Sequence, residues 1–170
     1  MFQNQTNVLA VSPGRHRIGV AVFRNGYLCY YRGKSLRQFR NEKSLQNAVE
    51  KFLANLVTRY GINYLTVQSL IRQQETSPLL IAVAELVKRF AEIEGIKLHE
   101  YSPFFVRQSF CRMQPPTQEN AARNIAKQYP ELERYLSRTK DWERRYYRYI
   151  FNAIAVGAVC SQELKDYQNV

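Results

Sequence analysis

The chain has 170 residues and an apolar content of 45 %, enough to bury one substantial hydrophobic core but short for two ordinary domains. Its 25 lysines and arginines outnumber 14 acidic residues, which gives a net charge of +11. No run reaches the roughly 18 apolar residues of a membrane span, and the polar N-terminus lacks a signal-like pattern, so we expect one cytoplasmic domain spanning residues 1–170.

The basic surplus favours a polyanionic partner, because a chain without one would repel itself. Nucleic acid is therefore the favoured class of partner. A basic surface that serves only solubility is the alternative. A membrane partner is not expected, because the basic residues are scattered through the chain instead of forming one block.

The first 32 residues predict three antiparallel strands. Residues 7–12 form an apolar run that ends at Pro13 and Gly14, which is typical of a buried strand followed by a turn. Residues 18–23 and 27–32 are two further strand-like runs, and Asn25-Gly26 between them favours a two-residue hairpin turn.

Two helix and strand units are predicted next. Apolar residues at helical spacing indicate a helix at residues 44–60, with Ser44 as its N-cap and Gly61 as its terminator. Residues 64–67 then form a strand that a right-handed crossover can place parallel to the first. A second helix at residues 78–94, closed by Gly95, leads to a fifth strand at residues 97–101. This order predicts an α/β fold in which helices flank a five-stranded mixed sheet.

The remaining chain is predicted to be helical at residues 103–110, 118–128 and 141 to about 164, with a proline-containing loop at residues 113–116. In the last helix, counting back from Asn152 by four, seven and eleven residues predicts one shared face. The residues at these positions are Arg148, Arg145 and Asp141. The opposite, buried side is expected to carry Ile150, Ala153, Ile154 and Gly157.

The cysteines and histidines do not suggest a metal site. Cys29, Cys111 and Cys160 are odd in number, far apart and flanked by apolar residues, so buried thiols are expected. His16 and His99 have no partner at ligand spacing.

Four segments together carry a family pattern. The first joins an apolar strand ending in Ser-Pro-Gly (residues 8–14) to a strand that runs through a glycine (residues 17–22). The others are a strand end (residues 65–69), a tyrosine followed by a basic residue before glutamine (residues 101–108), and a helical run of small and aliphatic residues (residues 151–157). In this order they resemble RuvC-type Holliday-junction resolvases, which have the ribonuclease H-like fold, and the resemblance covers nearly the whole chain.

The resemblance implies a site in which acidic side chains hold two Mg²⁺ ions at the scissile phosphate. At the matching positions this chain has Ser12, Gln68, Tyr149 and Asn152, none of which is acidic. A site without carboxylates would bind Mg²⁺ too weakly for catalysis, so we expect no catalytic residues, no metal and no cofactor. Without the resemblance, Ser12 and Gln68 are read simply as strand ends in solvent.

Arginines around the expected cleft are the candidate contacts with nucleic acid. Arg145 and Arg148 are expected to place fixed positive charge where the family places metal, although pairing with Glu143 or Asp141 is the alternative. Tyrosines beside arginines can stack on unpaired bases or pack in the core. The candidate arginines are Arg15, Arg17, Arg72, Arg107, Arg112, Arg145 and Arg148, and the tyrosines are Tyr27, Tyr30, Tyr31, Tyr146, Tyr147 and Tyr149.

Three functions stay open at this point. The favoured one is a catalytically inactive, resolvase-like protein that binds branched or structured DNA in preference to RNA, with a homodimer interface sought on the helix at residues 78–94. The second is an active Mg²⁺-dependent junction endonuclease whose acidic ligands have moved to Glu75, Glu100, Asp141 or Glu143. The third is a scaffold protein that has lost nucleic-acid binding.

Overall fold

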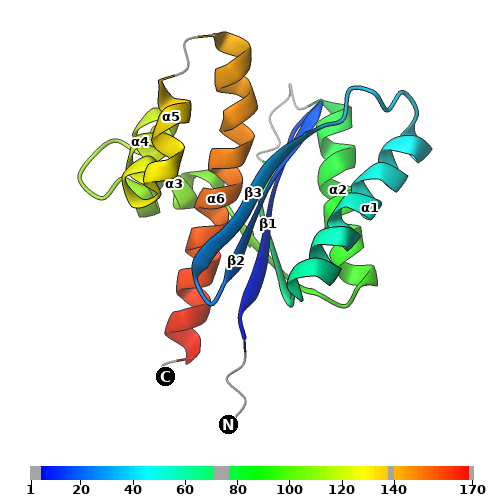
Figure 1. The fold of residues 1–170 in the computed structure, drawn as a ribbon, viewed down its shortest axis with the longest axis horizontal. Coiled ribbons are helices and arrows are strands. Elements are labelled where there is room, and N and C mark those ends of the chain that lie inside the picture. The colour runs from blue at the N-terminus through cyan, green and yellow to red at the C-terminus, as the bar shows by residue number, and fades with distance from the viewer. Residues whose placement is uncertain (1–4, 71–76, 138–139, 169–170) are drawn as a thin grey trace.

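A five-stranded sheet separates two layers of helices (Figure 1). The computed structural model describes residues 5–70, 77–137 and 140–168. The sheet order is β3-β2-β1-β4-β5; β1, β2 and β3 pair antiparallel, whereas β4 and β5 run parallel to β1. The predicted five-stranded mixed sheet is therefore confirmed. The strands are β1 (Asn7–Pro13), β2 (Arg17–Arg24), β3 (Tyr27–Ser35), β4 (Tyr64–Gln68) and β5 (Lys97–Tyr101).

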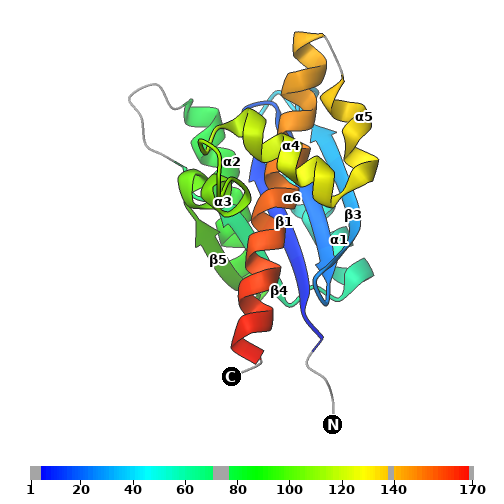
Figure 2. The same cartoon turned by 90° about the vertical axis from the view of Figure 1, so that its left-hand side faces the viewer.

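Helices cover both faces of the sheet, as the two perpendicular views in Figures 1 and 2 show. On one face lie α1 (Glu42–Tyr60) and α2 (Pro78–Ile93). On the other lie α3 (Pro103–Phe110), α4 (Gln118–Gln128), the 3-10 turn η1 (Pro130–Leu132), α5 (Glu133–Leu136) and the long α6 (Asp141–Gln168). Within the described ranges, no helix is both long enough and apolar enough to cross a membrane.

The strand periodicity divides the core between the two faces. Val8 and Ala10 of β1 pack in the core under α6, whereas Leu9 and Val11 pack in the core under α1 and α2. This alternation follows from the pleat, which points successive side chains to opposite faces. Because both faces are covered by helices, β1 and β2 carry continuous apolar runs, at residues 8–11 and 20–23, instead of alternating with polar residues.

Glycine lets α6 lie close to the sheet. A Cβ atom at Gly157 would overlap both the ring of Phe23 on β2 and the Cβ of Ala10 on β1. The helix backbone therefore sits at a distance from β1 and β2 that a larger side chain would not allow. This close approach holds the middle of α6 against β1 and β2.

Local signals set most of the element boundaries. Asn25 and Gly26 both have positive φ, 51° and 84°, as the predicted hairpin turn requires. Gly61 ends α1 in the left-handed conformation with φ 59°, also as predicted. The N-cap prediction was wrong: Asn41 caps α1, its Oδ1 accepting from the Ser44 backbone N–H at 2.8 Å, so Ser44 lies inside the first turn.

Two features of the fold were not predicted from the sequence. β3 continues to Ser35, beyond the predicted residue 32, because its pairing with β2 extends to Arg17. η1 and α5 were not predicted, since these short segments have too few residues to show helical periodicity.

The cysteines divide by their place in the fold. Cys111 and Cys160 are buried, as expected, and burial raises the pKa of the Cys160 thiol to about 11. The expectation was wrong for Cys29, which is exposed and donates a hydrogen bond to the Tyr27 carbonyl at 3.3 Å. Cys29 lies on β3, an edge strand, where apolar sequence neighbours do not guarantee a covering helix.

Candidate nucleic-acid interface

The register of the central strands brings Ser12 and Gln68 together. Val11 of β1 pairs with Val67 of parallel β4, so the residues that follow them are neighbours at the carboxyl ends of the two strands. Both side chains face α6, because Ala10 and Tyr64, at even spacing before them, pack in the core under that helix. Ser12 is buried, with 4 % of its surface exposed, and Gln68 is half-buried.

Helix α6 brings Tyr149 and Asn152 to the same strand ends. A Cβ atom at Gly14 would overlap the Tyr149 ring, and one at Gly19 would overlap the Tyr149 backbone, so Tyr149 lies directly on the turn between β1 and β2. One turn further along α6, Asn152 is half-buried, and its Oδ1 accepts a long hydrogen bond of 3.4 Å from Nε2 of Gln118. Gln118 begins α4, whose N-cap is Thr117.

These side chains line a cavity of about 590 Å³ that we name the strand-end pocket. Two cationic side chains also line it: Arg15, exposed in the turn after β1, and Arg107, half-buried on α3. Among the described residues that line it, none is aspartate or glutamate. The polar and charged part of the lining includes Ser12, Arg15, Gln68, Arg107, Gln118 and Asn152.

A second cavity, of about 490 Å³, lies between α3, α4, α5 and α6 and is named the helical pocket. Its lining includes Arg144 and Arg148 of α6 and the apolar side chains of Val106, Ile125 and Phe151. The helical pocket and the strand-end pocket have four lining residues in common, which are Gln68, Arg107, Gln118 and Asn152. The two cavities therefore meet along one polar rim.

Arg107 is held in place at this rim. Its Nε donates to the Pro116 carbonyl at 3.0 Å, which uses one of its five N–H donors and leaves the terminal amino groups for a ligand. Pro116 belongs to the loop that precedes α4, so the guanidinium group links α3 to the start of α4. A planar cation with several donors in fixed directions suits a phosphate or a base edge.

The structure separates the remaining candidate arginines. Arg148 lines the helical pocket, and Arg145 lines neither pocket. Since neither lines the strand-end pocket, a fixed charge from them at the metal positions stays a prediction. Arg17 on β2 lines neither pocket, and Arg112 lines two other hollows beside the α3–α4 loop. Arg72 lies outside the described residues.

Two site residues were not anticipated from the sequence. Arg144 lines the helical pocket because it precedes Arg148 by four residues, as Arg148 precedes Asn152, so the three share one row of the helix. Counting strictly by four from Asn152 would have found it. Gln118 carried no such signal, because only the docking of α4 against α6 brings it to Asn152.

The residues present at the strand-end pocket do not fit a pair of Mg²⁺ ions. Hard divalent cations need clusters of anionic oxygen, whereas the described lining offers serine and tyrosine hydroxyls, three amides and two guanidinium groups. Throughout the described parts of the chain, no group of three or more histidine, cysteine, aspartate or glutamate side chains could hold a metal ion.

The acids considered as relocated ligands do not gather at this pocket where they can be placed. Glu100 of β5 faces α2, where its carboxylate pairs with Lys88 Nζ at 3.2 Å. Glu119, which was not among these candidates, lines the helical pocket and forms an ion pair with Arg123. Glu75 lies outside the described residues, as do the side chains of Asp141 and Glu143.

The candidate tyrosines mostly pack against other side chains. Tyr30 lies on Tyr60 with ring centroids 5.6 Å apart, and Tyr147 stacks on Tyr135 at 4.2 Å. Tyr27 is 74 % exposed, with Lys165 above its ring. Tyr31 packs at the edge of the core under α6, and the Tyr146 side chain lies outside the described residues. Of these rings, Tyr147 and Tyr149 line the pockets.

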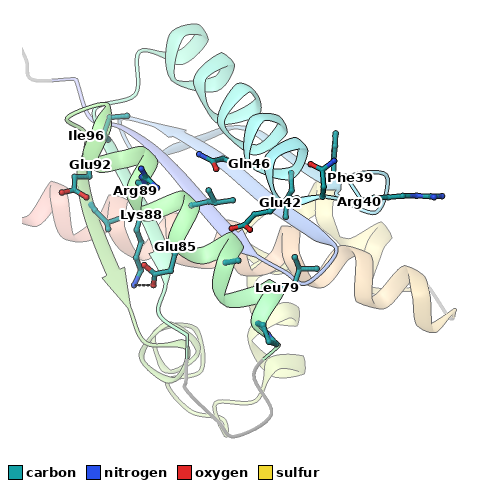
Figure 3. A pocket seen from close by; sticks show the side chains of 16 residues that line it. Phe39, Arg40, Glu42, Gln46, Leu79, Glu85, Lys88, Arg89, Glu92 and Ile96 are labelled. Atoms are coloured by element: carbon teal, nitrogen blue, oxygen red, sulfur yellow. Dashed lines mark ion pairs between the residues drawn. The ribbon is translucent and has the colours of Figure 1, made fainter.

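The opposite face of the sheet has its own hollow, the α1–α2 groove, of about 1110 Å³ (Figure 3). Acidic and basic side chains line it together, and Lys88 lies 4.0 Å from Glu85. The apolar face of α2 packs onto its own sheet and α1, which leaves Ile81 and Ile93 as its exposed large apolar residues within the described range.

The sheet order, the long helix α6 across its face and the pocket at the strand ends define the class: this is the RuvC-type resolvase fold, a ribonuclease H-like architecture. The structure matches T. thermophilus RuvC in complex with a Holliday junction substrate, with a TM-score of 0.70 and 15 % identity over 96 % of each chain. A second T. thermophilus RuvC structure gives 0.68 and 14 % identity, covering 96 % of this chain and 97 % of that one.

The match extends to a eukaryotic enzyme. The yeast mitochondrial Holliday junction resolvase Ydc2 has a TM-score of 0.65 and 9 % identity, over 96 % of this chain and 82 % of that one. No family model matches the sequence, and no curated protein does so either. At these identities the likeness is one of fold.

Proposed function

We propose that this protein binds branched or structured DNA across the strand-end pocket and does not cut it. The observation that carries the proposal is the lining of that pocket. Ser12, Gln68 and Asn152 meet where the resolvase family is expected to hold metal, and Arg107 shares the rim with them. The likeness to a RuvC that is in complex with a Holliday junction substrate supports a nucleic-acid partner.

The chemistry of the lining separates binding from cleavage. A guanidinium group neutralises a phosphate and donates several hydrogen bonds to it, but it does not activate water as paired metal ions do. Amide side chains add donors and acceptors without adding charge. With a net charge of +11, the protein should bind DNA with an affinity that falls steeply as salt rises.

The proposal has three finer features. DNA is preferred to RNA as the partner, the protein acts as a homodimer, and it works in the cytoplasm. Competition between DNA and RNA junctions of equal sequence tests the first feature. Sedimentation of the free protein and of its DNA complex tests the second, and localisation of the tagged protein in its own cells tests the third.

The test of the binding site uses the double variant Arg15→Ala with Arg107→Ala, the two arginines that line the strand-end pocket, and a fluorescent four-way junction. Loss of two phosphate contacts should weaken binding about tenfold or more and reduce the slope of log affinity against log salt by about 2. The matched control is Arg40→Ala with Arg89→Ala, which removes the same charge from exposed residues of the α1–α2 groove. Equal affinities and salt slopes for the two double variants would remove the proposed site.

The same junction tests the absence of cleavage. Incubation with Mg²⁺ or Mn²⁺ should leave all strands intact under conditions where the protein is saturated with DNA. Metal-dependent strand scission that copurifies with the protein would instead support the relocated-acid nuclease. Salt-independent or absent binding, together with a stable protein complex, would support the scaffold.

A further inference from the structure

The helical pocket has a chemistry that phosphate binding alone does not explain. Beside the charged side chains of Arg107, Glu119, Arg144 and Arg148, it has an apolar interior with side chains from α3, α4, α5 and α6, including a stacked pair of tyrosines. Phosphate-binding sites need donors on several sides, and an apolar interior would not favour an anion. The interior is formed by Val106, Ala122, Ile125, Tyr135, Tyr147 and Phe151.

The rim of the same pocket is polar and faces the strand-end pocket. Gln68, Gln118 and Asn152 carry amide groups, each of which offers both a donor and an acceptor, and Arg107 offers donors beside them. Asn152 and Gln118 are already linked at 3.4 Å, a long contact that leaves most of their hydrogen-bonding capacity unused. An apolar slot with amides at one end matches a flat heterocycle that has a polar edge.

The size of the pocket also fits one heterocycle and its sugar. Its volume of about 490 Å³ lies in the lower part of the range of small-molecule sites, which is about 300 to 1,000 Å³. Aromatic and aliphatic walls of this kind favour stacking, and the stacking of a base on an aromatic side chain is tolerant of sequence. Amides and arginine recognise the edges of bases through paired hydrogen bonds.

The shared rim connects this slot to the bound backbone. A strand whose phosphate contacts Arg107 at the strand-end pocket presents its neighbouring base to the helical pocket, because four residues belong to both cavities. A base can enter only if it has left the duplex stack. The duplex itself is too wide for the pocket, so unpaired positions at branches, bulges or single strands are selected.

We propose that the helical pocket holds one unpaired nucleobase, next to the phosphate bound at the strand-end pocket. This inference rests on the proposed function and deepens it, since it states why structured DNA is preferred to plain duplex. Gln118 and Asn152 contact the polar edge of the base, and the side chains around Phe151 contact its faces.

The test compares three DNA hairpins that differ at one position: fully paired, with one bulged adenine, and with an abasic bulge. The wild-type protein should bind the adenine bulge about tenfold more tightly than the other two, as expected for one stacked base. The abasic probe keeps the bend of the backbone and removes the base. A preference that survives the loss of the base would overturn the inference.

A second experiment fills the helical pocket with a larger side chain. Ala122→Phe places a ring in the helical pocket and should abolish the preference for the adenine bulge, while affinity for the paired hairpin stays within about twofold. The matched control is Ala82→Phe, which alters a half-buried alanine that lines the α1–α2 groove and should keep the preference. Equal preferences in the two variants would contradict the inference.

Gln118→Ala covers the case in which Ala122→Phe does not fold. Gln118 is exposed at the start of α4, and losing its hydrogen bonds should reduce the preference about three- to tenfold. An unreduced preference in this variant would overturn the role of the amide rim. The same bulge in RNA separates the two kinds of nucleic acid.

The outcomes separate this inference from the proposed function. A wild-type protein that binds none of the hairpins in a salt-dependent way would contradict the proposed function. A protein that binds all three equally, with affinity lost in the Arg15 and Arg107 double variant, would keep the proposed function and remove only the base pocket.

Discussion

The two faces of the sheet have hollows of different charge, one balanced and one positive. The α1–α2 groove is lined by Glu42, Glu85 and Glu92 together with Arg40, Lys88 and Arg89, so its charges nearly cancel. The strand-end pocket on the other face is lined by Arg15 and Arg107, without an acid among its described residues. The larger hollow is therefore the less suited to a polyanion, and charge pattern identifies the binding face better than volume does.

The faces also differ in how closely their helices approach the sheet. On the α6 side, Gly14, Gly19 and Gly157 lie where any Cβ atom would meet the sheet or the helix. On the other side, α1 and α2 contact the sheet through branched and aromatic side chains such as Val49, Leu53 and Phe90. The close approach of α6 brings Asn152 to the strand ends, so backbone packing and the binding site depend on each other.

The largest expected effect comes from placing carboxylates at the strand ends. The triple variant Ser12→Asp, Gln68→Glu, Asn152→Asp should lose about 3 to 5 kcal/mol of stability without metal, because Ser12 is buried and an unpaired charge there is costly. Mn²⁺ at a hundredfold excess over its Kd should return about 2.7 kcal/mol. Thermal unfolding with and without Mn²⁺ measures both effects.

This stability loss should also depend on pH. Burial raises the pKa of an introduced carboxyl group, so the folded state binds more protons than the unfolded state and the variant becomes less stable as pH rises from about 5 to 8. The control is Gln46→Glu in the α1–α2 groove, which should show no shift with Mn²⁺. If Mn²⁺ does not raise the unfolding temperature of the triple variant, these three positions do not form a common ligand set.

The next largest effect is expected at the contact between α6 and the sheet. Gly157→Ala should cost about 1 to 3 kcal/mol, because the added methyl group overlaps Phe23 and Ala10. Denaturant unfolding gives the loss. Adding Phe23→Leu should make the combined loss smaller than the sum of the two single losses, since the two residues share one contact. Strict additivity would argue against the overlap.

A smaller loss of stability is expected from a change on the other face of the sheet. Asn41→Ala removes the side-chain cap of α1 and should cost about 1 kcal/mol in denaturant unfolding. Because α1 lies away from the strand-end pocket, the affinity for a four-way junction should not change. Gly157→Ala, by contrast, should affect both quantities. A binding defect in Asn41→Ala would mean that the two faces are coupled.

The smallest effect is a difference in thiol reactivity among the three cysteines, with no change in stability. At about pH 8, a thiol reagent should label Cys29 rapidly and leave Cys111 and Cys160 unmodified until the protein unfolds, since both are buried and the Cys160 pKa is raised to about 11. Mass spectrometry of labelled peptides provides the measurement. Cys29→Ser should remove all labelling of the native protein, and residual labelling would contradict the burial of the other two.

The sequence by itself determined the order of the main strands and helices, the Asn25-Gly26 hairpin and the Gly61 terminator. These features depend on short-range periodicity and on single residues with special backbone preferences, so they are readable locally. By resemblance it also predicted that Ser12, Gln68 and Asn152 stand at positions where the resembled family has acids. Neither inference required knowledge of distant contacts.

The tertiary structure decided which side chains share a pocket. The rotation of α6 against the sheet placed Arg144 and Arg148 at the helical pocket and left Arg145 outside it, and the docking of α4 brought Gln118 to Asn152. The same long-range packing left Cys29 exposed on an edge strand. Such outcomes depend on contacts between residues far apart in the chain, which no local pattern encodes.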